Sequence, residues 1–185
     1  WVTLAEVPGI ILPQGGQGDR SADVPPFEAY DGEDRHYLEA LGTGASGKET
    51  PLYSDLLSTI GSEDALSWSN AFAKIAWRLH PPAAAEAFAE RASSNTLNEM
   101  DRTAALVALA YTGNKKAIDS IVETASNSTG MTKAHSVWWL LNRMGNWKDF
   151  DVAAQLKEKG IYEVSNFELS YYIAYFFLYR FLNNT

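Results

Sequence analysis

The sequence predicts an all-α protein in which pairs of helices stack into an α-solenoid. Three observations lead to this expectation. Strand patterns are nearly absent beyond residue 33, and apolar side chains recur at helical spacing from residue 34 onward. A helix-pair pattern also recurs every 32 to 33 residues, which is typical of solenoids. We therefore expect an irregular arm over residues 1–33, helical repeats over 34–162 and an aromatic C-terminal helix over 163–185.

The composition is that of a folded chain and excludes several classes of function. With 185 residues, 46% of them hydrophobic, the chain can bury a sizeable core or form a short repeat array. Its net charge of −8 and its lack of a basic run argue against a nucleic-acid partner, which requires a positive surface. Because the chain has no cysteine, disulfides, thiolate metal sites and covalently attached haem are excluded.

The arm over residues 1–33 is predicted to be irregular. It contains Pro8, Pro13, Pro25 and Pro26 together with several glycines, and such residues interrupt regular elements. Its "GGQG" stretch lacks the lysine and hydroxyl residue of a phosphate-binding loop, so we do not expect it to bind phosphate.

The stretch "YDGEDRHYLEALG", residues 30–42, is predicted to begin the first helix. Asp31 is expected to be its N-cap, and Glu33 and Asp34 would lie near the positive end of the helix dipole. Gly42 is expected to end this helix. Its buried face would consist of Tyr37, Leu38 and Leu41.

Further helices are predicted in order along the chain. A short one contains Leu56, Leu57 and Ile60, and another covers "SEDALSWSNAFAKIAWRLH", residues 62–80. The two prolines that follow His80 end this helix and begin the next, "PPAAAEAFAERAS". The helix in "NEMDRTAALVALAYTGN" is expected to end at Gly113.

The repeat is visible when these helices are aligned with those that follow. Residues 85–92 align with 118–125 at an offset of 33, and residues 101–114 align with 133–146 at an offset of 32. A third copy begins with "GNWK" and continues into "DFDVAAQLKEKG". The period is shorter than that of HEAT repeats, and the tetratricopeptide pattern is missing, so we describe the predicted units as HEAT-like.

The end of the chain is apolar and strongly aromatic. From Leu169 to Leu182, only Ser170 and Arg180 interrupt this character, so a helix here would be apolar on every side. Such a stretch is shorter than the roughly 20 residues that span a bilayer. We therefore expect a buried capping helix, with a membrane contact through residues 167–182 as the alternative.

The sequence predicts no catalytic, cofactor-binding or metal-binding residues. His36, His80 and His135 lie in different helices without metal-ligand spacing, and Ser46 beside Lys48 is only a weak nucleophile candidate. Adjacent Trp138 and Trp139 point about 100° apart on a helix, so at most one of them can face the core. The acidic residues of the later helices are expected on solvated faces: Glu86, Glu90, Asp101, Asp119 and Glu123.

Several motifs together resemble a known family. "YDGEDRHYLEALGTGASGKE", "AWRLHPPAAAEAFAERA", "DRTAALVALAYTGNKKAIDSIVETA" and "HSVWWLLNRMGNWKDFDVAAQLKEKGIY" are similar to the HEAT-like repeat region of large bacterial multidomain membrane-bound dehydrogenases. In that family a sugar-dehydrogenase-like β-propeller precedes the repeats, and a c-type cytochrome domain with CxxCH follows. This chain has neither part, so the family's quinone-cofactor and haem residues have no counterparts here. The resemblance implies export from the cytoplasm.

These observations lead to one functional expectation and two alternatives. We expect a non-catalytic scaffold of a periplasmic or otherwise extracytoplasmic electron-transfer assembly. It would bind proteins such as a c-type cytochrome or dehydrogenase domain through its solenoid surface and aromatic tail. One alternative is an accessory subunit of a membrane complex, anchored by that tail. The other is a small enzyme with an acidic site formed by Asp31, Glu33, Asp34 and His36.

Overall fold

The computed structural model describes residues 27–161 and contains helices but no strand in that range. The predicted all-α class is confirmed there. Residues 1–26 of the predicted arm and the whole predicted C-terminal helix lie outside the described residues. The chain divides between Pro81 and Pro82 into two compact units, each of which is described by itself.

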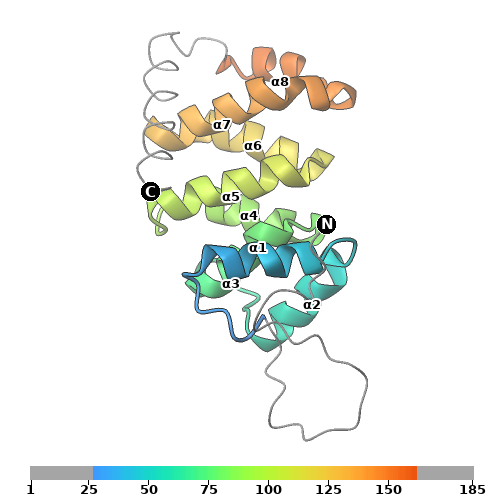
Figure 1. Ribbon diagram of the computed structural model, residues 1–185. Helices are drawn as coiled ribbons and strands as arrows, with labels where there is room; N and C mark the ends of the chain where they lie inside the picture. The colour runs from blue at the N-terminus through green and yellow to red at the C-terminus, as the bar shows by residue number, and fades with distance from the viewer. Residues whose placement is uncertain (1–26, 162–185) are drawn as a thin grey trace, which may run out of the picture. The chain divides into compact units, whose positions relative to one another are not determined.

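In its described part, 27–81, the first unit contains three α-helices and one short 3₁₀ helix (Figure 1). Helices α1 and α2 both pack against α3. Leu38 and Leu41 of α1 are buried, and Tyr53, Trp68 and Phe72 form an aromatic cluster, with the Trp68 and Phe72 ring centroids 4.9 Å apart. The elements are α1 (Arg35–Gly44), α2 (Glu49–Thr59), the 3₁₀ helix Ala65–Ser67 and α3 (Asn70–Leu79).

Both predicted ends of the first helix were wrong. The N-cap of α1 is Asp34, whose carboxylate accepts a hydrogen bond from the Tyr37 amide at 3.0 Å. Asp31 instead accepts from the Glu33 amide at 2.8 Å and so stabilises the preceding turn. The helix continues through Gly42 to Gly44, and the missing side chain of Gly42 makes room for Arg78 instead of ending the helix.

The start of α3 also differs from the prediction, whereas its end is confirmed. Asp64 caps a separate 3₁₀ helix by accepting from the Leu66 amide at 3.0 Å. Helix α3 begins later, where the Ser69 hydroxyl accepts from the Phe72 amide at 3.1 Å. It ends at His80, which adopts a left-handed conformation with φ of 32° directly before the prolines.

The second unit contains five α-helices in its described part, 82–161. Gly113, in the left-handed conformation with φ of 61°, ends α5 as predicted. Asn98 and Asn114 cap the starts of α5 and α6 by accepting from backbone amides. The elements are α4 (Ala85–Ser93), α5 (Glu99–Thr112), α6 (Lys115–Asn127), α7 (Gly130–Arg143) and α8 (Val152–Glu158), with 3₁₀ helices Pro82–Ala84, Met144–Asn146 and Lys148–Phe150.

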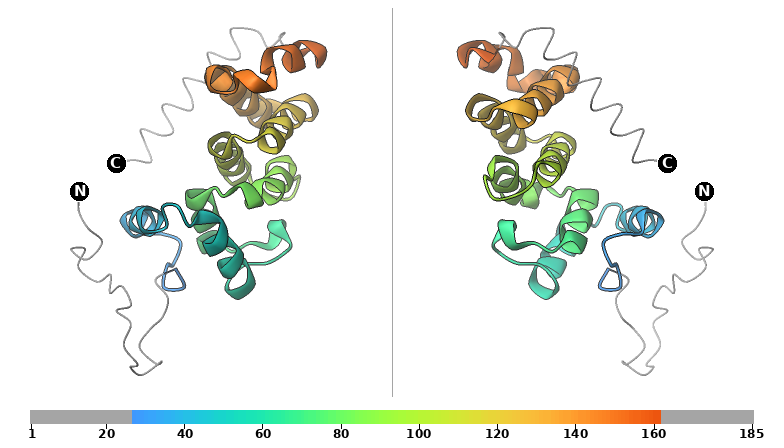
Figure 2. Two further views of the ribbon diagram at one scale, coloured as in Figure 1. Left: turned by 90° about the vertical axis from the view of Figure 1, so that its right-hand side faces the viewer. Right: turned by 90° about the vertical axis from the view of Figure 1, so that its left-hand side faces the viewer.

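The helices of this unit pack in two layers. Helix α4 packs on α5 and α6 on α7, while α4 also contacts α6 and α5 also contacts α7. Figure 2 shows these helices end-on, with α4 and α6 in one layer and α5 and α7 in the other. The largest fully buried side chains between the four helices are Phe88, Leu106, Leu109, Ile118, Ile121 and Leu140.

Residues 32 positions apart in the sequence meet between α5 and α7. The Thr103 hydroxyl lies 3.0 Å from Nδ1 of His135. The Arg143 guanidinium lies 4.8 Å from the centroid of the Tyr111 ring, so this cation also contacts the residue 32 positions before it. Trp139 is 8% exposed and Trp138 is half-buried, which confirms that only one of them belongs to the core.

Candidate functional site

The acidic cluster near residue 31 is exposed, and its carboxylates hold backbone and amide donors. Asp31 and Asp34 accept from backbone amides, and these hydrogen bonds lower the pKa of Asp31. Oε1 of Glu33 accepts from the Asn70 side-chain amide at 3.1 Å. His36 is exposed in the first turn of α1. The structure therefore places the four residues close together, in roles at the start of a helix.

The three histidines occupy separate positions. His36 lies in α1, His80 ends α3, and His135 is buried in α7 beside Thr103. Residues 27–161 contain no group of three or more His, Cys, Asp or Glu residues that could hold a metal ion. Within the same range, no helix is both long and apolar enough to cross a membrane.

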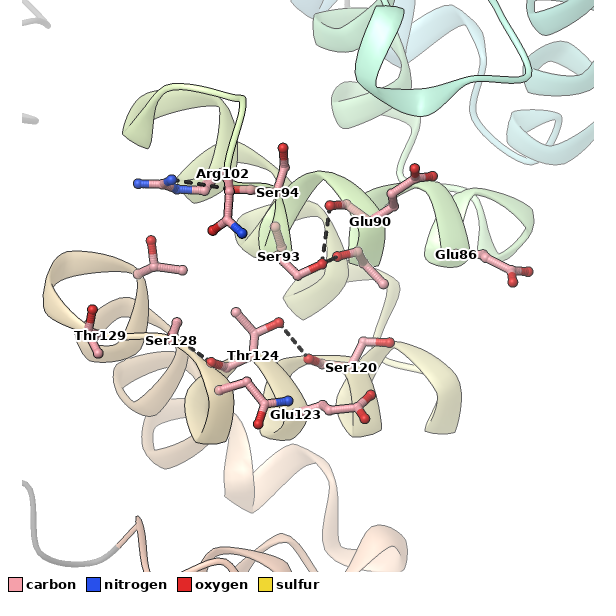
Figure 3. A pocket seen from close by; sticks show the side chains of 15 residues that line it. Glu86, Glu90, Ser93, Ser94, Arg102, Ser120, Glu123, Thr124, Ser128 and Thr129 are labelled. Carbon is pink, nitrogen blue, oxygen red and sulfur yellow. Dashed lines mark hydrogen bonds between the residues drawn. The ribbon is translucent and has the colours of Figure 1, made fainter.

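A groove lined largely by polar residues lies between α4 and α6, with a volume of about 610 Å³ (Figure 3). We call it the α4–α6 groove. Its walls come from the two helices, and its far end comes from the loops that follow them together with Arg102 of α5 and Thr132 of α7. The lining residues include Glu86, Glu90, Ser93, Ser94, Arg102, Ser120, Glu123, Thr124, Asn127, Ser128, Thr129 and Thr132.

The hydroxyl groups of the groove walls use their protons within their own helices. Ser93 donates to the Ala89 carbonyl at 2.9 Å, and Ser120 donates to the Lys116 carbonyl at 2.8 Å. Thr124 donates to the Ser120 carbonyl at 2.8 Å, and Ser128 donates to the Thr124 carbonyl. Because a hydroxyl has a single proton, these oxygens can only accept hydrogen bonds from a ligand.

Three carboxylates add negative charge to the same groove. Glu86, Glu90 and Glu123 lie toward one end, as Figure 3 shows. Glu86 is paired with Lys116, whose Nζ lies 2.7 Å from Oε2, and this hydrogen bond lowers the pKa of Glu86. Among the ion pairs of the described residues, none involves Glu90 or Glu123. Both remain available to an external cation.

The opposite end of the groove contains Arg102. Its Nη1 donates to the Ser94 carbonyl at 3.2 Å, which holds the guanidinium beside the loop after α4 (Figure 3). Its Nε is buried and has no hydrogen-bond partner among the described atoms. Because a guanidinium has five N–H donors, Arg102 can also donate to an acceptor of a ligand at this end.

The groove carries hydrogen-bond acceptors and charge that suit binding. The protons of Ser93, Ser120, Thr124 and Ser128 are donated to backbone carbonyls, and the carboxylates of the lining lie beside them. What it offers is a row of acceptors with negative charge at one end and one guanidinium at the other.

Glu86, Glu90 and Glu123 are exposed, which confirms the solvated faces predicted for them. The groove itself was not predicted, because its two walls lie about one helix pair apart in the chain. A signal was present in Ser120, Thr124 and Ser128, which are spaced four residues apart and therefore share one face of α6.

Comparison with known proteins gives no assignment. No protein-family model matches the chain, and no curated protein or solved structure is significantly similar to it.

Proposed function

We propose that this chain is a non-catalytic docking module that binds an extended, basic segment of a partner protein in the α4–α6 groove. The observation that carries the proposal is the row of hydroxyl acceptors on the groove walls, where Ser93, Ser120 and Thr124 donate their protons to backbone carbonyls. Lysine and arginine side chains and backbone amides are donors, so they complement both the hydroxyl oxygens and the free carboxylates. The guanidinium of Arg102 would receive a carbonyl oxygen of the same segment.

The proposed architecture for this task is a HEAT-like α-solenoid. The two-layer packing of α4 to α7 and the contacts between residues 32 positions apart support it. In such arrays each helix pair buries its apolar face against the next, and extended grooves between repeats bind partner segments.

We further propose that the partner belongs to an extracytoplasmic electron-transfer assembly, as a c-type cytochrome or a dehydrogenase domain. This step rests on the resemblance of residues 28–162 to the repeat region of multidomain dehydrogenases. The module would hold such partners together and would itself carry no redox group.

Binding of synthetic peptides to the intact chain tests the groove. The probes are three labelled peptides of equal length, in which every second residue is lysine, glutamine or glutamate. Fluorescence anisotropy should detect binding of the lysine peptide that weakens with added salt, because salt screens exposed charges. The glutamine and glutamate peptides should bind more weakly.

The double variant E90Q/E123Q should weaken binding of the lysine peptide about fivefold, since each exposed ion pair contributes up to about 1 kcal/mol. The matched control E28Q/E158Q removes the same charge from exposed positions outside the groove and should bind as the wild type does. Equal affinity for all three peptides, or an equal loss in both double variants, would contradict the proposed groove.

A further inference from the structure

Helix α5 carries an apolar stripe that faces solvent. Met100 is 65% exposed and Tyr111 is 51% exposed, and they are the two large apolar side chains that stay exposed in the described residues. Ala104 is exposed and Val107 is half-buried. The spacing of these four residues, i, i+4, i+7 and i+11, places them along one side of the helix. We call this surface the α5 stripe.

The outer side of α6 provides a comparison within the same unit. Lys115, Lys116 and Asp119 are polar and at least partly exposed there, as is usual for a helix surface in water. The α5 stripe has no charged residue at the equivalent places. Exposed apolar side chains aligned on one helix face are a candidate contact surface.

The apolar surface continues onto the neighbouring helix. The rings of Tyr111 and Trp139 are 5.8 Å apart, and Trp139 contacts Trp138 at 4.8 Å between ring centroids. Trp138 is itself half-buried, so an aromatic surface extends from α5 to α7. Aromatic side chains of a covering element would find both stacking and edge contacts there.

We infer that residues 167–182 of the same chain cover the α5 stripe. This stretch is apolar and rich in Phe and Tyr, so it requires burial as much as the stripe does. Ile161, which is buried in the second unit, is separated from it by residues 162–166, which can span about 17 Å. Sixteen helical residues are about 24 Å long, and packed helices lie about 8 to 10 Å apart, so the stretch can cross both α7 and α5.

Disulfide trapping in the intact chain tests this contact, because the protein has no cysteine of its own. The variant A104C is combined in turn with I173C, A174C, F177C and L178C. A disulfide requires Cα atoms within about 7 Å. After mild oxidation, we expect an intramolecular disulfide from A104C to those tail positions that lie on the same helical face as one another. Mass spectrometry of the monomer identifies the disulfide.

The matched control pairs K115C, at an exposed position of α6 outside the groove lining, with the same four tail positions and should stay reduced. V107C replaces A104C as a second, independent position on the stripe, and circular dichroism verifies that each variant folds. The inference is overturned by equal cross-linking of the stripe and the control, or by disulfide-linked dimers in place of monomers. It is also overturned if the variants fold but form no disulfide. This includes the case in which the full chain is found to float with phosphatidylcholine–phosphatidylglycerol vesicles. Peptide binding in the α4–α6 groove and cross-linking on the α5 stripe are measured separately. Failure of one proposal therefore leaves the other standing.

Discussion

Asp31 and Asp34 hold different backbone donors at the start of α1. Asp34 accepts from the third amide after it and so caps the helix, whereas Asp31 accepts from the amide two residues on and holds the preceding turn. One oxygen of each carboxylate, Oδ1, accepts these hydrogen bonds. At this scale, both residues have a structural role in the backbone at the start of α1.

Replacement of Asp34 should destabilise the first unit. We expect D34A to lower the free energy of unfolding by about 1 kcal/mol, because a free amide is left at the start of α1. D34S keeps a capping oxygen and should retain most of the stability. Urea unfolding monitored by circular dichroism measures both, and a D34A variant as stable as D34S would contradict the assigned cap.

At the scale of whole elements, α1 and α3 approach closely where Gly42 meets Arg78. A Cβ atom on Gly42 would lie 2.3 Å from Cζ of Arg78, whose Nε is held 2.8 Å from the Glu39 carboxylate. The glycine is thus required by the neighbouring helix and not by the backbone of α1, in which it is helical.

This contact predicts that the effect of G42A on the free energy of unfolding changes sign when Arg78 is replaced. In the wild type, G42A should destabilise the protein by about 1 to 3 kcal/mol, because Arg78 must leave its place. In the R78A background, the same substitution should stabilise by about 0.5 to 1 kcal/mol, since alanine favours a helix over glycine. The four proteins form a double-mutant cycle in urea unfolding, and the same sign in both backgrounds would refute the packing explanation.

At the scale of the whole molecule, stability should depend on pH through His135. Burial lowers the pKa of this imidazole, which lies beside Thr103 between α5 and α7. The unfolded chain therefore binds a proton near about pH 6.5, whereas the folded chain binds it only at lower pH. The free energy of unfolding should fall as the pH decreases through about 6.5. Below the pKa of His135 in the folded protein, this residue should no longer contribute to the change of that free energy with pH.

Chemical unfolding of wild type and H135Q at a series of pH values measures this effect. The variant should lose the part of the slope that begins near about pH 6.5. H36Q, which removes an exposed imidazole from α1, serves as the control and should retain that slope. A slope unchanged by H135Q would show that other groups cause the pH dependence.

The all-α class and the positions of α5, α6 and α7 follow from the sequence by itself. Apolar residues recur there at helical spacing, and Gly113 permits a left-handed helix end that other residues resist. The starts of α1 and α3 did not follow, because Asp31 and Asp34, or Ser62, Asp64 and Ser69, all satisfy the same local capping rule. Which of them caps a helix depends on the packing of that helix against its neighbours.

Local periodicity thus determined which segments are helical, since it depends only on residues a few positions apart. The tertiary structure decided what those helices present to a partner. The α4–α6 groove joins two walls that are about 30 residues apart, and the acceptors on those walls depend on where each hydroxyl proton is donated. The burial of His135 and the fit of Arg78 over Gly42 likewise arise between helices, where contacts distant in the chain set the environment of each group.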